Sequence, residues 1–224
     1  NRIEQFVLAH ELTHAIDDQH FDLDRLDGLV ARCQEERFQA ALGIVEGSAN
    51  HFATQVLIRF PIQEGGSLPE DGTQEVPPFI VDLQAYPYTT GQRFADALSD
   101  ADGPSAIDDA LETFPTTTEQ VMHPTKFPHE AAEAVEVADF APTFGSGWRD
   151  LDVMVVGELW LKILLHLHLD DVVAAPAAAG WNGGIYRAWT DGDDVAVIMS
   201  TVWDTPKDAQ EFSDALKLWV SRGS

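Results

Sequence analysis

The segment His10-Glu11-Leu12-Thr13-His14 holds the residues of this sequence best suited to catalysis. Residues four apart lie on one face of a helix, so the two imidazoles can reach a single metal ion. Glu11 lies beside that pair, where its carboxylate can hold a metal-bound water without binding the metal. Zinc lowers the pKa of such a water towards about 7, and the Glu can accept its proton during attack on a carbonyl. The pattern predicts a Zn²⁺-binding helix from about Arg2 to Gln19.

A catalytic zinc site needs a third protein ligand, and Glu46 is the best candidate. It lies within the apolar stripe of a second helix, expected from about Glu35 to Phe60. A carboxylate in such a stripe breaks the burial pattern unless it binds a cation. Gly43 and Gly47 flank Glu46, and each costs about 1 kcal/mol in a helix, which favours a close approach by another backbone. Asn50, one turn later, could accept a hydrogen bond from a ligand imidazole.

HELTH, with a glutamate and a polar residue four positions apart downstream, resembles the gluzincin metallopeptidases, of which thermolysin is the best known. The resemblance implies Glu11 as general base and, as zinc ligands, His10, His14 and Glu46. It also implies that Asp18 and Asn50 support the ligand imidazoles. Two features differ from thermolysin: the gap between His14 and Glu46 is longer, and Asn50 replaces an aspartate.

A closer resemblance covers nearly the whole chain. The sequence is similar to a family of uncharacterised, often envelope-associated prokaryotic gluzincin-like proteins in the phrases HELTHAIDDQHFDLD, ALGIVEGSA, YPYTTGQRFADAL, TTTEQVMHP, AAAGWNGGIY and TVWDTPKDAQEF. Glu119 and His123 match the fourth phrase, whereas Gly184-Ile185 stands where the family has an Asp-Arg pair. The resemblance favours a cell-envelope or extracellular location and implies an activity class without a substrate.

The residue that would stabilise the oxyanion of a tetrahedral intermediate is left open between two candidates. Zinc proteases often use a cationic or phenolic donor, so either His123 or Tyr186 could serve. His123 precedes a proline, which favours an extended conformation. Glu158, within an apolar helix, is a reserve metal ligand.

Composition excludes several classes of protein. The 224 residues contain 13 Lys+Arg and 38 Asp+Glu, a net charge of −25, which repels phosphate backbones and argues against nucleic-acid binding. The acidity is typical of a protein that stays hydrated in concentrated salt. No apolar run approaches the roughly 18 residues that span a bilayer. The single cysteine, Cys33, excludes an internal disulfide framework. The opening at Asn1, at the start of an expected helix, leads us to expect an N-terminally incomplete chain.

The pattern of elements predicts a mostly helical α+β protein of the zincin type, with two central metal-binding helices. We expect residues 1–150 to form the metal-binding region and 151–224 a helix, β-hairpin and helix packed on it. The first helix has apolar residues on two sides, which predicts burial between two layers. The remaining elements are expected as loops over 22–28 and 61–78, helices over 79–86, 91–99, 104–113, 152–169, 170–179 and 205–220, an irregular segment over 114–150, and paired strands over 186–188 and 195–202.

Two functions fit these features. In the first, the protein is a zinc-dependent metallopeptidase that acts on a peptide or protein substrate. In the second, zinc joins two helices of a binding or scaffolding module. Glu11 favours the peptidase, because a purely structural site needs no base beside the metal. Oligomeric state does not follow from the sequence.

Overall fold

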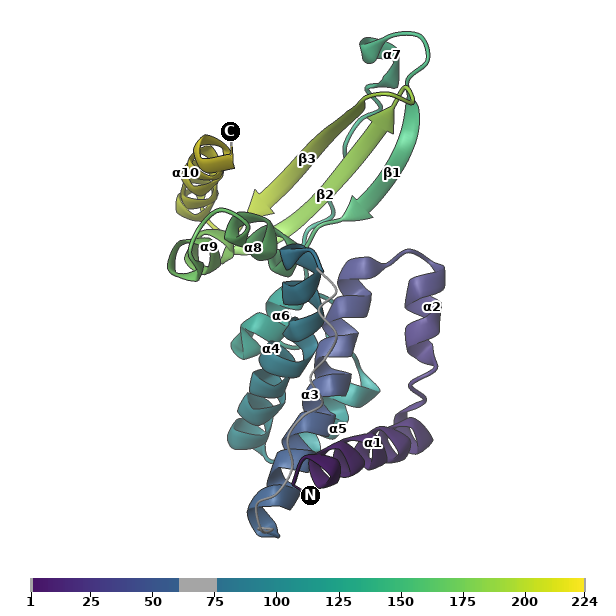
Figure 1. Cartoon of the computed structure of the whole chain (residues 1–224), viewed down its shortest axis with the longest axis vertical. Helices are drawn as coiled ribbons and strands as arrows, with labels where there is room; N and C mark the ends of the chain where they lie inside the picture. Colours follow the sequence, from purple (N-terminus) through teal and green to yellow (C-terminus); the bar gives the residue numbers. More distant parts are fainter. Residues whose placement is uncertain (1, 61–75, 224) are drawn as a thin grey trace.

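The computed structural model describes residues 2–60 and 76–223, which form a mostly helical α+β structure with one small antiparallel sheet (Figure 1). The elements follow in the order α1 (Arg2–Phe21), α2 (Arg25–Ala31), α3 (Glu35–Arg59), α4 (Pro78–Asp102), α5 (Ser105–Glu112), α6 (Thr118–Met122), η1 (Pro124–Lys126), α7 (Ala141–Phe144), β1 (Arg149–Val155), α8 (Glu158–His166), α9 (Asp171–Ala178), β2 (Trp181–Thr190), β3 (Val195–Trp203) and α10 (Pro206–Gly223). Among the described helices, none is long and apolar enough to cross a membrane. Most of the loop expected over 61–78 lies outside the described residues.

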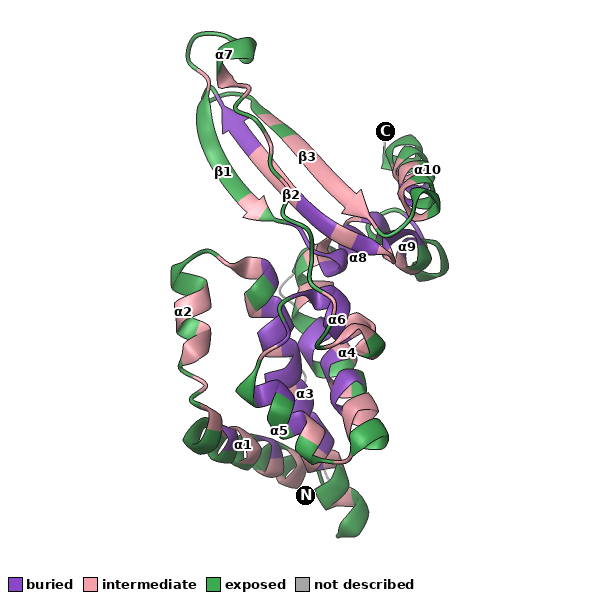
Figure 2. Ribbon diagram, turned by 180° about the vertical axis from the view of Figure 1, so that it is seen from behind, coloured by how far each residue is buried: buried purple, intermediate pink, exposed green. Residues whose placement is uncertain are grey.

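Helix α3 is the central element of the helical part, and its surface is largely buried (Figure 2). Glu35 and Glu36 occupy its first turn, where negative charge favours a helix start. Its small and apolar side chains pack against α4, α5 and α6 in the first of two hydrophobic cores.

Helices α3 and α4 approach each other closely through glycines. A Cβ atom on Gly47 would overlap the carbonyl group of Gly91, and a Cβ on Gly91 would overlap the carbonyl group of Gly43. The expected backbone approach at Gly43 and Gly47 is therefore confirmed. The two helices predicted over 79–86 and 91–99 form one continuous helix, α4, despite its internal proline, Pro87. Tertiary packing outweighs the local preference of proline to end a helix.

Helix α1 lies on the outside of the molecule, so the prediction of burial between two layers is wrong. One face packs on α3, while several large apolar side chains elsewhere on α1 are about half exposed: Val7, Leu8, Leu12 and Ile16. The periodicity identified two apolar stripes correctly but could not tell how many of them have a packing partner. The following acidic stretch also differs from the expected loop, because it leads into helix α2.

The C-terminal part contains a three-stranded antiparallel sheet in the order β1-β2-β3. The expected hairpin is confirmed, but its strands are longer, and it turns at residues 191–194, where Gly192 has a positive φ of 110°. Thr205 caps α10 by accepting a hydrogen bond from the amide of Asp208 at 3.3 Å, as its position before Pro206 predicts. The segment expected to be irregular contains two short α-helices and a 3₁₀ turn.

The prediction of a helix over 152–169 is wrong for its first third, because residues 152–155 belong to strand β1. Strand pairing with β2 decides this, and the apolar run does not reveal it because short apolar runs suit either structure. Helix α8 begins only after Gly157. Its opposite faces enter two cores: Leu159 and Ile163 join the helical core, while Leu161 and Leu165 join the C-terminal core. Helix α8 is thus the joint between the two parts.

Candidate metal centre

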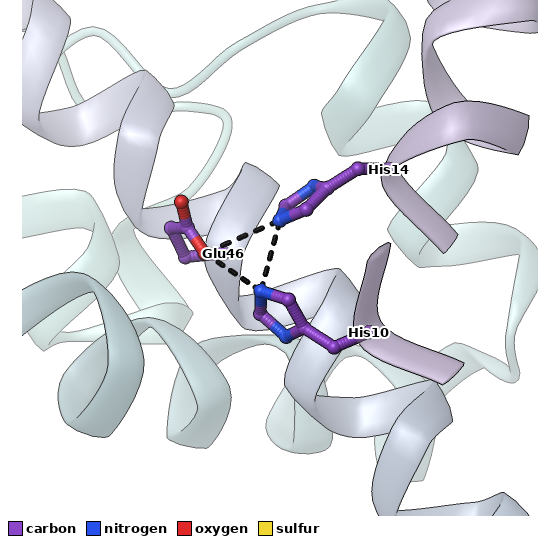
Figure 3. A group of neighbouring side chains, drawn as sticks. All are labelled: His10, His14 and Glu46. Atoms are coloured by element: carbon purple, nitrogen blue, oxygen red, sulfur yellow. Dashed lines mark hydrogen bonds and ion pairs between the residues drawn. The ribbon is translucent and has the colours of Figure 1, made fainter. Parts of the chain in front are cut away.

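Three side chains from α1 and α3 converge on one point (Figure 3). The Nε2 atoms of His10 and His14 lie 3.0 Å apart. The Glu46 Oε2 atom lies 3.2 Å from His10 Nε2 and 3.3 Å from His14 Nε2. One helical turn separates the histidines on α1, and the packing of α1 on α3 brings Glu46 to both of them.

The spacing of these three atoms fits a tetrahedral metal ion. Nitrogen and oxygen ligands about 2.0–2.2 Å from zinc lie about 3.3 Å or slightly more from one another in that geometry. The observed distances of 3.0, 3.2 and 3.3 Å match this arrangement with little movement. Two imidazoles and one carboxylate also form a donor set that zinc accepts.

The hydrogen bonds of Asn50 fix the protonation pattern of His10. Asn50 donates its side-chain amide to the carbonyl oxygen of Tyr88 at 2.9 Å, which directs its Oδ1 atom to His10. The His10 Nδ1 atom lies 3.0 Å from that oxygen, which can only accept, so Nδ1 must carry the proton. In the neutral ring, the Nε2 lone pair then faces the other two ligand atoms. Asn50 thus holds His10 in the tautomer that binds a metal.

Electrostatics at the centre favour a cation. The hydrogen bond with Glu46 raises the pKa of His14, and the charges of Glu46 and Glu11 act in the same direction. Burial acts to raise the pKa of Glu46, but the hydrogen bond from His14 and the two histidines outweigh it and lower the pKa. An ionised carboxylate therefore faces two imidazole nitrogens in a half-buried setting.

The aspartate that is buried near the site is Asp17, the neighbour of the predicted Asp18. Asp18, expected beside His14, is exposed and accepts a hydrogen bond from the Leu23 amide at 3.0 Å, so that expectation is corrected. Asp17 is buried instead and accepts a hydrogen bond from Ser48 on α3 at 2.9 Å. Three residues after His14, it lies on the helix face that packs against α3, a relation that helical periodicity could have revealed.

Glu11 and Tyr88 also lie beside the converging ligands. The exposed Glu11 is close enough for its charge to raise the pKa of both His14 and Tyr88. Tyr88, on α4, hydrogen bonds through its side chain to Glu46, and its ring centroid lies 6.2 Å from that of His10. Sequence reasoning missed Tyr88, because neither its spacing nor its type connects it to the HELTH helix.

The two expected oxyanion donors lie elsewhere in the fold, which corrects both expectations. His123 Nε2 contacts Glu158 Oε1 at 2.8 Å. Glu158 in turn lies close enough to the buried Glu36, near the start of α3, for its charge to raise the pKa of Glu36. Ten residues of α3, about 15 Å along its axis, separate Glu36 from Glu46. Tyr186, on β2, donates a hydrogen bond to Asp152. Glu158, the reserve ligand, therefore does not reach the histidine pair.

One other group of acidic side chains converges within the described part of the chain. Glu119, Glu130 and Asp204 offer carboxylate oxygens close enough to share an ion. The Lys126 ammonium already lies among them, at 2.7 Å from Glu119, 2.5 Å from Glu130 and 2.7 Å from Asp204. A lysine thus supplies the cation for this cluster, and the histidine-containing site is the stronger metal candidate.

In the comparisons with known proteins, the match lies in the C-terminal part of the chain. Residues 146–223 match the model of a domain of unknown function, DUF8575, which spans β1 to α10. No curated protein and no solved structure shows significant similarity to the chain. The converging ligands on α1 and α3 lie outside the matched range.

Proposed function

We propose that the protein is a zinc-dependent metallopeptidase of the gluzincin type. The observation that carries the proposal is the convergence of His10 Nε2, His14 Nε2 and Glu46 Oε2 beside Glu11, with spacing suited to a tetrahedral ion. Zinc bound there would act as a Lewis acid and lower the pKa of a coordinated water. The fold around the site would be a helical variant of the zincin arrangement.

The residues of the chain divide the chemical work. Asn50 orients His10, and the contact between Asp17 and Ser48 holds α1 against α3. Glu11 faces solvent beside the ligands, where it can take a proton from the attacking water and return it to the leaving amine. Tyr88 is the nearest phenolic donor at the site, and it replaces His123 and Tyr186 as the candidate that stabilises the oxyanion.

One observation favours the scaffolding alternative. Zincins usually align the substrate along an edge strand beside the metal-binding helix. The described sheet lies at the opposite end of the molecule from α1 (Figure 1). If no strand outside the described residues reaches the site, zinc would join α1 to α3 and contribute folding energy without efficient hydrolysis.

A comparison of three variants tests the proposal. We expect Glu11→Gln to keep the fold and the zinc stoichiometry while lowering peptide hydrolysis about 10²–10⁴-fold, because the proton acceptor is lost. His14→Ala should lose the metal itself. His20→Ala is the matched control, because His20 lies on the same helix, is exposed and hydrogen bonds through its ring to the carbonyl of Ile16, within its own helix.

The measurements are metal content by elemental analysis and cleavage of casein and a broad peptide library, with and without chelator. The peptidase proposal fails if the wild type binds zinc but cleaves no faster than Glu11→Gln. In that case the scaffolding function accounts for the site. A wild type that binds no zinc would exclude both functions.

A further inference from the structure

A cavity of about 430 Å³ lies where α1, α3 and α5 meet. Residues of all three helices line it, among them His20 of α1, Phe52 of α3 and Asp108 of α5. The cavity shares no lining residue with the ligands of the metal centre. His20 follows Glu11 by nine residues, which is two and a half helical turns, so the two residues lie on opposite sides of α1. The cavity is therefore separate from the place where Glu11 would act.

Asp17 is the buried polar residue of this lining. It is 5% exposed, and its Oδ2 atom accepts a hydrogen bond from the Ser48 hydroxyl at 2.9 Å. Its Oδ1 atom has no hydrogen-bond partner among the described residues, yet it is not one of the partnerless atoms that the protein encloses completely. Because Asp17 lines the cavity, this oxygen is the one that a ligand there can reach. A carboxylate oxygen on so buried a residue is costly to leave without a donor.

The polar side chains of the lining have only acceptors left to offer. The Thr13 hydroxyl donates its hydrogen to the Ala9 carbonyl at 2.9 Å. His20 Nδ1 lies 2.8 Å from the Ile16 carbonyl oxygen, so Nδ1 carries the proton and Nε2 of the neutral ring is an acceptor. Asp108 adds a second carboxylate, and within the described part of the chain no lysine or arginine lines the cavity. A ligand must therefore supply the donors.

The two carboxylates favour a ligand with a positive charge. Burial raises the pKa of Asp17, and the charge of Asp108 acts in the same direction, so the two groups lie close enough to repel each other. The two clusters whose atoms converge closely enough for a metal ion do not include them. An ammonium group carries three N–H donors and can reach acceptors that stand further apart than metal ligands do.

The other walls of the cavity are apolar. Phe21 and Phe52 are partly buried and pack against the helical core, which holds their rings in place. Ile16 contributes a half-exposed aliphatic side chain. Two aromatic rings beside two carboxylates suit a ligand with a cationic end and an aromatic body, and the volume lies within the range of small-molecule sites.

We propose that this cavity binds a small primary amine with an aromatic body, of about the size of 2-phenylethylamine. The ammonium group donates to Asp17 Oδ1 and to the Asp108 carboxylate, and the ring packs against Phe21 and Phe52. This site does not depend on the metal centre or on its proposed activity.

Three related probes separate the charge from the aromatic body in isothermal titration calorimetry of the metal-free, full chain. 2-Phenylethylamine carries both features, ethylamine carries the ammonium without the ring, and 2-phenylethanol carries the ring without the charge. We expect 2-phenylethylamine to bind with a Kd of about 1 mM or tighter, as its few heavy atoms allow, and each of the other two at least about 10-fold more weakly.

Substitutions of the two carboxylates test the charged contacts. Asp17→Asn keeps an oxygen for Ser48 and should weaken 2-phenylethylamine about 10-fold or more, because a charge-assisted contact at a buried group is lost. Asp108→Asn, at an exposed position, should weaken it about 3-fold or more and leave 2-phenylethanol unchanged. Asp109→Asn is the matched control, because Asp109 is the exposed neighbour on α5, carries the same charge and does not line the cavity.

The aromatic contact has its own readouts. Phe52→Leu keeps an apolar side chain against the helical core and should weaken 2-phenylethylamine several-fold while leaving ethylamine unchanged. In a methyl NMR spectrum, the bound ring should shift the Ile16 signal, which Ile16→Val assigns. Bound 2-phenylethylamine that leaves this signal in place would contradict the proposal.

The calorimetric results can overturn the proposal in three ways. It is wrong if 2-phenylethylamine does not bind, or if ethylamine binds as tightly, because net charge alone would then explain the attraction. It is also wrong if Asp109→Asn weakens binding as much as Asp108→Asn does. Binding that is lost in Glu46→Gln but kept in Asp108→Asn would assign the amine to the metal centre. If Asp17→Asn fails to fold, as circular dichroism would show, the exposed Asp108→Asn decides the result.

Discussion

Helix α3 carries two buried or half-buried glutamates whose surroundings give them opposite properties. Glu46 faces two imidazoles from α1, and its pKa is lowered despite its burial. Glu36, ten residues earlier, is buried against Thr118, and burial raises its pKa to about 7, with the charges of Glu158 and Glu119 acting in the same direction. A glutamate on the same helix thus has a lowered pKa at one end and a pKa raised to about 7 at the other.

The difference shows that the neighbouring elements determine what each carboxylate can do. At the metal centre, α1 supplies nitrogen ligands, so the negative charge is matched when a cation binds. At the joint, α6 supplies two hydrogen-bond donors, both from Thr118, together with the acidic Glu119, and α8 supplies the acidic Glu158. A carboxylate buried in such surroundings is stable in its protonated form, or in its charged form when a cation lies beside it.

Replacing each glutamate by glutamine should separate the two regions, and the largest effect is expected at the metal centre. Glu46→Gln removes a ligand charge and should weaken zinc binding by more than the 10–100-fold that loss of a supporting contact usually costs. Glu36→Gln should leave zinc affinity unchanged. Competition with a chromophoric chelator measures both. Equal zinc affinity in wild type and Glu46→Gln would remove Glu46 from the ligand set.

A smaller effect is expected on stability at the joint. Burial raises the Glu36 pKa from 4.5 to about 7, so the folded state holds this proton more strongly than the unfolded state does. The resulting stability is present below about pH 4.5 and is lost as the pH rises to about 7, a change of about 3 kcal/mol at most. Glu36→Gln removes this dependence and should become increasingly more stable than the wild type from about pH 5 to about pH 8.

Urea unfolding of both proteins at the two pH values measures this difference. The side chains that face Glu36 are Thr118, Glu119, Glu158 and Tyr86, and they are unchanged in the variant. A stability difference between variant and wild type that is the same at both pH values would show that Glu36 does not titrate in this range.

The smallest change in the difference between the two regions is expected when the salt concentration is raised. With a net charge of −25, self-repulsion opposes compaction until counterions screen it, over about 10 Å at 0.1 M and about 3 Å at 1 M. The melting temperature should rise by several degrees from about 0.1 M to about 2 M KCl. The extra stability of Glu36→Gln at about pH 8 should persist, because a buried charge is poorly screened. A flat or falling melting temperature would contradict adaptation to high salt.

Local patterns predicted much of the candidate site because its ligands are spaced by helical geometry. His10 and His14 share a face whatever else surrounds α1, and Glu46 stands out because a carboxylate interrupts an apolar stripe. The same reasoning extends to Gly43 and Gly47, whose cost in a helix indicated a close neighbour. Asp18 was preferred to Asp17 because the expectation came from a family resemblance rather than from the face that α1 turns to α3.

The tertiary structure decided everything that depends on contacts between distant segments. Strand β1 forms because β2 pairs with it, and α4 continues through Pro87 because Gly91 packs against α3. The same long-range packing brings Tyr88 to the metal centre and takes His123 away from it. Which residues share a helix face follows from their spacing along the chain, because that relation is local. Which faces meet, and therefore which glutamate has a lowered pKa and which a raised one, depends on burial and partners that only the folded chain provides.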